Sequence, residues 1–181
     1  IPYFTQKFGN ASSIHASGRE AKAALEDARN RCARGLGCKT SEIAFTSGGT
    51  ESDNFAVKGG AFAYRKKGRH VITSPIEHHA VSVSCEFLAR EGFDITYLPV
   101  DSQGLVDPDE LRKAVRPDTT LVTIMHANNE TGIIQDVKEL ARITHEAGAI
   151  FHTDAVQSTG KLPYKISDLD CDLLSISAHK L

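Results

Sequence analysis

The chain has 181 residues, 40% hydrophobic and 24% charged, which is enough for one domain with a substantial buried core. Its formal net charge is -2, and both signs are interspersed without a basic stripe, so a nucleic-acid partner is not expected. No apolar run reaches the roughly 18 to 20 residues that span a bilayer, and the start IPYFTQKFGN lacks the pattern of a secretory signal. We therefore expect no membrane partner and a cytoplasmic location, or an organellar one if the source is eukaryotic.

A helix is expected near the start of the chain, where Ala and Leu recur at helical spacing over Ser17–Leu36 and glycines follow as stop signals. The next run, EIAFTS over Glu42–Ser47, is β-prone and ends at two glycines. Helical periodicity resumes at Thr50. This order predicts a strand, a glycine turn and a helix.

Strands and helices are expected to alternate over the rest of the chain. Strands are predicted near Val71, Ile95, Val122, Phe151 and Leu174, and helices over 80–90, 107–115 and 137–147. Short apolar strands separated by helices predict an α/β fold with a mostly parallel sheet and helices on both faces. Ligands of such sheets bind beyond the carboxyl ends of the strands, so functional groups are expected there.

Three features fall at these predicted strand ends. The turn TSGGTESDN opens a helix, whose free N–H groups favour a phosphate, although two glycines and a capping threonine also occur as plain structural features. Asp154 follows an apolar strand and either caps a helix or pairs with a pyridinium nitrogen. Lys180 follows the last strand and is either a solvated charge or a Schiff-base amine. Together they predict a site for pyridoxal 5'-phosphate (PLP).

The four cysteines predict no metal centre, because none belongs to a CxxC pair and the adjacent histidines His78 and His79 do not make a zinc cluster. The cysteines are expected to be mostly buried thiols in a reducing compartment. His126 and His152 lie in apolar segments and are expected to be hydrogen-bonded near-core residues.

Six strings in order resemble motifs of the NifS/IscS-like cysteine desulfurases, of the class V aminotransferase family and PLP fold type I: NASSIHASGR, TSGGTESDN, IEHHAV, MHANNETGIIQD, HTDAVQSTGKLP and SAHK. The resemblance covers essentially the whole chain. It implies that residues 1–181 are the PLP-binding large domain, ending just after the Schiff-base lysine and without the small C-terminal domain. It also implies that Asn10–Arg19 helps to shape the substrate pocket.

The resemblance implies a role for each of nine residues. Lys180 is implied to hold PLP as a Schiff base and to move protons, and His78 to stack on the pyridine ring and act as an acid or base. Asp154 is implied to pair with the pyridine nitrogen. The remaining implied cofactor contacts are Gly49, Thr50, Ser177 and His179 on the phosphate side, Gln157 at the phenolic oxygen, and Asn129 at the cofactor or substrate.

The implied reaction converts L-cysteine to L-alanine and passes sulfur to an enzyme cysteine as a persulfide, for iron–sulfur cluster assembly or thiolation. The family carries that cysteine well beyond the lysine, so we expect residues 1–181 alone not to complete turnover. Expected partners are a second copy of the chain in a homodimer and a sulfur-acceptor or scaffold protein. The alternatives are a selenocysteine lyase, kynureninase or aminotransferase on the same fold, or a non-catalytic fragment.

Overall fold

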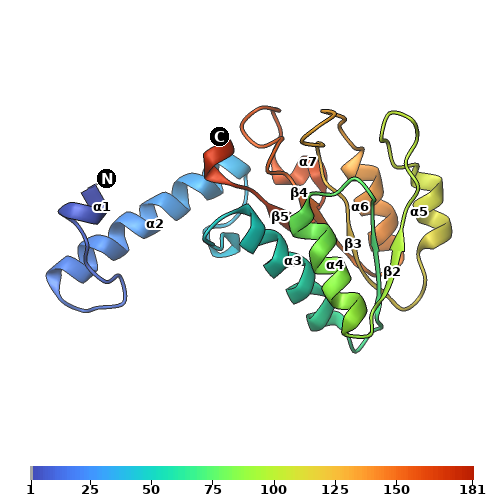
Figure 1. Ribbon diagram of the computed structural model, residues 1–181. Coiled ribbons are helices and arrows are strands. Elements are labelled where there is room, and N and C mark those ends of the chain that lie inside the picture. Colours follow the sequence, from blue (N-terminus) through green and yellow to red (C-terminus); the bar gives the residue numbers. More distant parts are fainter. Residues whose placement is uncertain (1) are drawn as a thin grey trace. The chain divides into compact units, whose positions relative to one another are not determined.

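The computed structural model describes residues 2–181 (Figure 1). They divide into two compact units, the first ending at Phe45 and the second spanning Thr46–Leu181. That residues 1–181 make up one large domain stays a prediction. Within residues 2–181, no helix has both the length and the apolar character needed to cross a membrane.

The first unit contains the expected helix as α2, Ala16–Leu36, together with the short helices α1, Pro2–Thr5, and η1, Thr40–Glu42. The His15 side chain accepts the N–H of Gly18 at the start of α2, and Gly37, with φ 77°, ends the helix in the left-handed conformation. Only glycine fits at position 18, because a Cβ there would lie 2.3 Å from the Ser13 carbonyl oxygen. Residues 10–15 therefore form a tight turn that leads into α2, and residues 16–19 are the first turn of that helix.

The strand predicted over Glu42–Ser47 is wrong. Glu42 closes η1, and residues 43–47 pair with no strand in the part of the chain that the structure describes. A β-prone run becomes a strand only when a neighbour supplies hydrogen bonds. Here the segment has no such neighbour among residues 2–181 and remains a loop.

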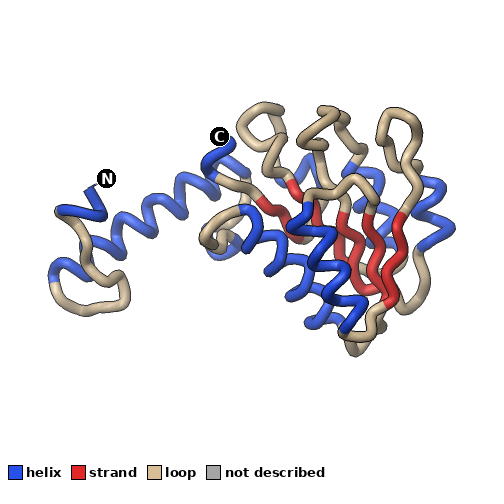
Figure 2. The backbone as a smooth tube through the Cα atoms, viewed as in Figure 1, coloured by secondary structure: helices blue, strands red, loops and turns tan. Residues whose placement is uncertain are grey.

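The second unit is built on a five-stranded, wholly parallel sheet with the order β2-β1-β3-β4-β5 (Figure 2). The strands are β1 His70–Thr73, β2 Asp94–Tyr97, β3 Thr119–Thr123, β4 Ile150–Asp154 and β5 Leu173–Ser175. Each of the five coincides with a predicted strand. The α/β fold with a parallel sheet is thus confirmed.

Helices cover both faces of the sheet (Figure 1). On one face lie α3, Gly49–Tyr64, and α4, His79–Arg90; on the other lie α5, Pro108–Ala114, α6, Val137–Glu146, and the short α7, Ile166–Leu169. Adjacent residues of a strand pack on opposite faces of the sheet. Val71 packs against α3 and α4, whereas Ile72 packs against α5 and α6. The inner strands β1, β3 and β4 are therefore buried on both faces, whereas the edge strand β2 is partly exposed.

The helix α3 lies very close to the sheet at Gly60, where a Cβ would be 3.0 Å from the Ile150 Cδ1 atom. At its start, a Cβ on Gly49 would be 3.2 Å from Val156 Cγ2, just beyond β4. Because Gly49 and Gly60 have no side chain, α3 approaches the sheet closely at both positions. Its first turn consequently reaches the carboxyl ends of β4 and β5.

The strand order places a topological switch point between β1 and β3, because the chain leaves β1 for β2 on one side and returns to β3 on the other. In sheets of this kind a crevice opens at the carboxyl ends of the strands at this point. The loops after β1 and β3 flank it, and the ends of β4 and β5 continue along the same edge. The short helix η2, Ala178–Lys180, follows β5 there.

Candidate functional site

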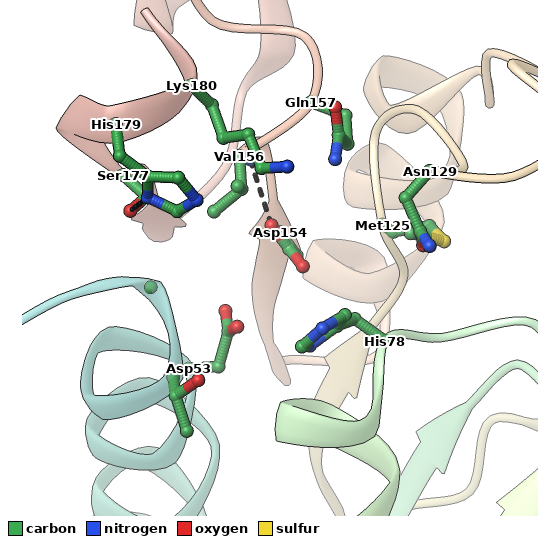
Figure 3. A pocket seen from close by; sticks show the side chains of 12 residues that line it. Asp53, His78, Met125, Asn129, Asp154, Val156, Gln157, Ser177, His179 and Lys180 are labelled. Atoms are coloured by element: carbon green, nitrogen blue, oxygen red, sulfur yellow. Dashed lines mark hydrogen bonds between the residues drawn. The ribbon is translucent and has the colours of Figure 1, made fainter.

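A cavity of about 290 Å³ lies at this edge of the sheet (Figure 3). All nine residues predicted for the site line it, although they come from five separate segments of the chain. The lining residues are Gly49, Thr50, Asp53, His78, Met125, Asn129, Asp154, Val156, Gln157, Ser177, His179 and Lys180. Strand ends that are distant in sequence thus meet at one place, and the predicted cofactor roles of the nine stay predictions.

The first turn of α3 forms one wall. Helix α3 begins at Gly49, and the first N–H groups of a helix have no acceptor within the helix. Across from this turn the Ser177 hydroxyl lies 2.8 Å from His179 Nδ1, and both residues line the cavity. Backbone N–H groups, a hydroxyl and an imidazole together can hold an anion at a helix start of this kind.

Asp154 lies at the end of β4 and is only 5% exposed. Its Oδ1 accepts the backbone N–H of Val156 at 2.9 Å, drawn as a dashed line in Figure 3. Burial raises the pKa of Asp154, whereas this hydrogen bond and the nearby His78 lower it. A cationic ring nitrogen beside this buried carboxyl group would offset the cost of burying the negative charge of Asp154.

Lys180 stands in η2, immediately beyond β5. Its side chain is exposed and extends over the same cavity that Asp154 lines from below (Figure 3). An amine and a carboxyl group on the same side of the sheet are what the predicted PLP site requires. Had they stood on opposite faces, the prediction would have failed.

His78 and Asn129 enter the cavity from the loops on either side of the switch point (Figure 3). The Nδ1 atom of His78 accepts the Ala80 N–H at 3.1 Å, so the ring also caps the start of α4. This bond fixes the ring while leaving its exposed face to the cavity. His79, one residue further, does not line the cavity.

Sequence reasoning missed Asp53, which lines the cavity although it is only 1% exposed. Burial, with a smaller contribution from the Asp154 carboxyl, raises the pKa of Asp53 to about 7, and the Ser175 hydroxyl opposes the rise. Helical spacing could have found it: Asp53 follows Gly49 by four residues and therefore shares its helix face.

Below Asp53 lies a chain of polar side chains that crosses from α3 to β3. His152 is fully buried; its Nδ1 lies 2.8 Å from the Thr123 hydroxyl and its Nε2 3.1 Å from the Ser175 hydroxyl. Ser52 donates to Ser175 at 2.9 Å. The prediction that His152 is a hydrogen-bonded core residue is confirmed. His126, predicted likewise, is buried, but its Nδ1 has no partner among residues 2–181.

Glu77 is a second buried acid that the sequence did not reveal. Its Oε1 accepts the Ser74 hydroxyl at 2.6 Å and the Met125 N–H at 3.0 Å, which joins the loops after β1 and β3. Its Oε2 has no partner within the described chain. Burial raises the pKa of Glu77 to about 8, although both hydrogen bonds lower it.

The cysteines lie away from this site. All four are free, none lines the cavity, and only Cys85 is fully buried, so the expectation of mostly buried thiols is wrong for the other three, which are half-buried. Burial raises the pKa of the Cys85 thiol to about 12 and that of Cys171 to about 11. Both are therefore poor thiolate nucleophiles at neutral pH.

Comparison with known proteins gives a consistent picture. The family model described as aminotransferase class-V matches residues 1–181. A cysteine desulfurase IscS from Dictyoglomus turgidum is 58% identical over 179 residues, which are 99% of this chain and 45% of that protein. This chain spans about half the length of the curated relatives that it matches.

Two solved structures have the same fold. One, described as a NifS-like protein, is 45% identical with a TM-score of 0.95, over 99% of this chain and 50% of the other. The second, described as SspA in complex with cysteine, is 42% identical with a TM-score of 0.94, over 99% of this chain and 52% of the other.

Proposed function

Because this chain belongs to the class-V aminotransferase family and resembles cysteine desulfurases over its whole length, we propose that it forms the PLP-binding part of a cysteine desulfurase. The observation that supports this most is the meeting of Asp154, Lys180 and the first turn of α3 at one cavity. The fold alone would not support this function, because proteins of one fold have many different activities.

The residues present fit PLP, which combines an anionic phosphate, a basic ring nitrogen and an aldehyde. The start of α3 with Ser177 and His179 suits the phosphate, and a Cβ at Gly49 would fill this cradle, since it would lie 3.4 Å from the Ser177 Cβ. The buried Asp154 suits the ring nitrogen. The exposed amine of Lys180 suits the aldehyde.

The chain's own residues then have distinct tasks. When bound, PLP supplies an electron sink for the bonds around the substrate α-carbon. The Asp154 carboxylate would accept the hydrogen of the ring nitrogen and keep that nitrogen protonated. Lys180 would hold the cofactor through Nζ and would move protons at the substrate. His78 would stack on the ring, and Gln157 and Asn129 would orient its polar edge.

We propose L-cysteine as the substrate, with support from the 42% identical protein whose structure is described as a complex with cysteine. No cysteine of residues 2–181 lines the cavity, so the thiolate that takes the sulfur is proposed to lie outside the described residues. Transfer onward to iron–sulfur cluster assembly or thiolation, a homodimer and a cytoplasmic location belong to the same proposal and follow from the family resemblance.

Cofactor binding tests the proposal directly. The complete gene product is stripped of cofactor and given PLP, reduced with borohydride and digested; a pyridoxyl group is expected on Lys180. The Lys180→Ala variant should carry no label and should lose alanine release from L-cysteine by about 10²- to 10⁴-fold, the range for losing a general acid–base group. The control Lys138→Ala, on α6 and away from the cavity, should match the wild type. Labelling at another lysine would contradict the assignment.

A further inference from the structure

Two acids lie together at the base of the cavity. Asp53 comes from α3 and Asp154 from the end of β4, and Figure 3 shows both side chains projecting into the same space. They are 1% and 5% exposed, and within residues 2–181 no lysine or arginine nitrogen lies within 4.0 Å of either. Two buried negative charges without a cation would be costly, so the pair retains a proton.

The contacts decide which of the two carries the charge. Asp154 Oδ1 accepts the N–H of Val156, a bond that stabilises a carboxylate. Asp53 Oδ1 accepts no hydrogen bond from the described residues, and the Ser175 hydroxyl, which lowers the pKa of Asp53, also lies within hydrogen-bond distance of Ser52 and His152. The negative charge is therefore more stable on Asp154 and the proton on Asp53.

His152 does not supply a compensating charge, although its Nε2 lies only 3.8 Å from Asp53 Oδ1. The ring is fully buried between the hydroxyls of Thr123 and Ser175. Burial lowers the pKa of His152 to about 3, so the ring is neutral near pH 7. A neutral ring leaves Asp53 without an ionic partner.

We propose that Asp53 is a charge-setting residue: it keeps the proton, so that the pair presents one negative charge, on Asp154, to the single positive charge of a pyridinium. This rests on the proposed PLP site, on which Asp53 acts through the charge of Asp154 and not as a cofactor ligand. The other titratable groups around the pair are His152 on β4, Glu77 and His78 after β1, and His179 and Lys180 in η2. Glu77, whose pKa burial raises to about 8, is protonated near pH 6 and adds no further negative charge to the pair.

The first test uses cofactor-free protein and needs no PLP. In a Glu77→Gln background, which removes the other buried acid, the infrared spectrum at pH 6 should contain the carbonyl stretch of a buried carboxylic acid that disappears when Asp53→Asn is added and persists when Asp154→Asn is added. The melting temperature of Asp53→Asn should rise relative to that of the wild type as pH increases from 5 to 8, because the Asp53 carboxyl must ionise over this range and the amide of the variant cannot. If the acid band is lost in Asp154→Asn and kept in Asp53→Asn, the proton lies on Asp154 and the proposal is overturned. Should Asp53→Asn not fold, Asp53→Ser serves in its place.

The second test measures PLP affinity by equilibrium titration at pH 6. Asp53→Asn should bind within about threefold of the wild type, because it replaces a neutral acid by a neutral amide. Asp154→Asn should bind at least about tenfold more weakly, which corresponds to about 1.4 kcal/mol. A loss of tenfold or more in Asp53→Asn would show that Asp53 is ionised and would overturn the inference. If the wild type itself binds no PLP, the proposed function fails, while the infrared result still decides where the proton lies.

Discussion

His78 combines two tasks at the scale of a single residue. Its Nδ1 accepts the Ala80 N–H at the start of α4, while its ring faces the cavity. Capping bonds of this kind contribute about 0.5–2 kcal/mol, so the helix holds the ring in the orientation that stacking on a cofactor needs. Any substitution of His78 therefore affects both the helix and the site, and a test has to separate them.

We expect three variants to separate these effects. His78→Asn retains a cap but loses the ring, and should weaken PLP binding by about 2- to 10-fold, as expected for an aromatic contact worth about 0.5–1.5 kcal/mol. His78→Phe keeps the ring, so PLP affinity should be near that of the wild type, while the melting temperature falls through loss of the cap. His79→Ala is the control, because this residue does not line the cavity. Titration with PLP and thermal unfolding are the measurements; equal affinity in all three variants would argue against stacking.

At the scale of elements, the approach of α3 to the sheet determines the phosphate side of the site. Gly49→Ala adds a Cβ at 3.2 Å from Val156 Cγ2 and 3.4 Å from Ser177 Cβ, so the helix start and the loops beyond β4 and β5 must separate slightly. We expect PLP affinity to fall by about 5- to 160-fold, since such overpacking typically costs about 1–3 kcal/mol. The matched control is Gly48→Ala, where a Cβ meets nothing within 4 Å. If both variants bind PLP equally, the close contact at Gly49 has no importance for binding.

The order of elements could be predicted from the sequence because it depends on local periodicity. Each of the five strands was predicted, and so were α4, α5 and α6; the short helix α7 between β4 and β5 was not. The segment 43–47 was misjudged because strand formation depends on a partner, which local composition does not encode. Asp53 and Glu77 were missed for a related reason: acids normally lie at the surface, and their burial results from packing between segments that are far apart in sequence.

At the scale of the whole molecule, Glu77 makes stability depend on pH. Its folded pKa, about 8, lies above the ordinary value near 4.3, so the folded chain holds a proton that the unfolded chain has released. This contribution to stability is fully present below about pH 4 and is lost as pH rises towards 8. We expect the cofactor-free protein to become progressively less stable across this range.

The variant Glu77→Gln tests this dependence, because an amide oxygen can still accept from Ser74 and Met125 but cannot ionise. It should reduce the decline in unfolding free energy between pH 5 and 9 by on the order of 1–3 kcal/mol. Glu77→Leu leaves both donors without an acceptor and should destabilise the protein at every pH. Urea unfolding at several pH values measures both effects. A wild type and a Glu77→Gln variant with parallel profiles would show that Glu77 does not titrate in this range.

The acids at the base of the cavity and the residues at its rim belong to different kinds of structure. Asp53 stands on a helix that packs against the sheet, and His152 and Asp154 stand on a strand within it. Asn129 and Gln157 stand on connecting loops. Loops tolerate exchange and insertion far better than packed elements do. Variants at Asn129 and Gln157 should therefore fold more readily than variants at Asp154, which makes the rim, rather than the base, the part of this cavity that directed evolution can alter.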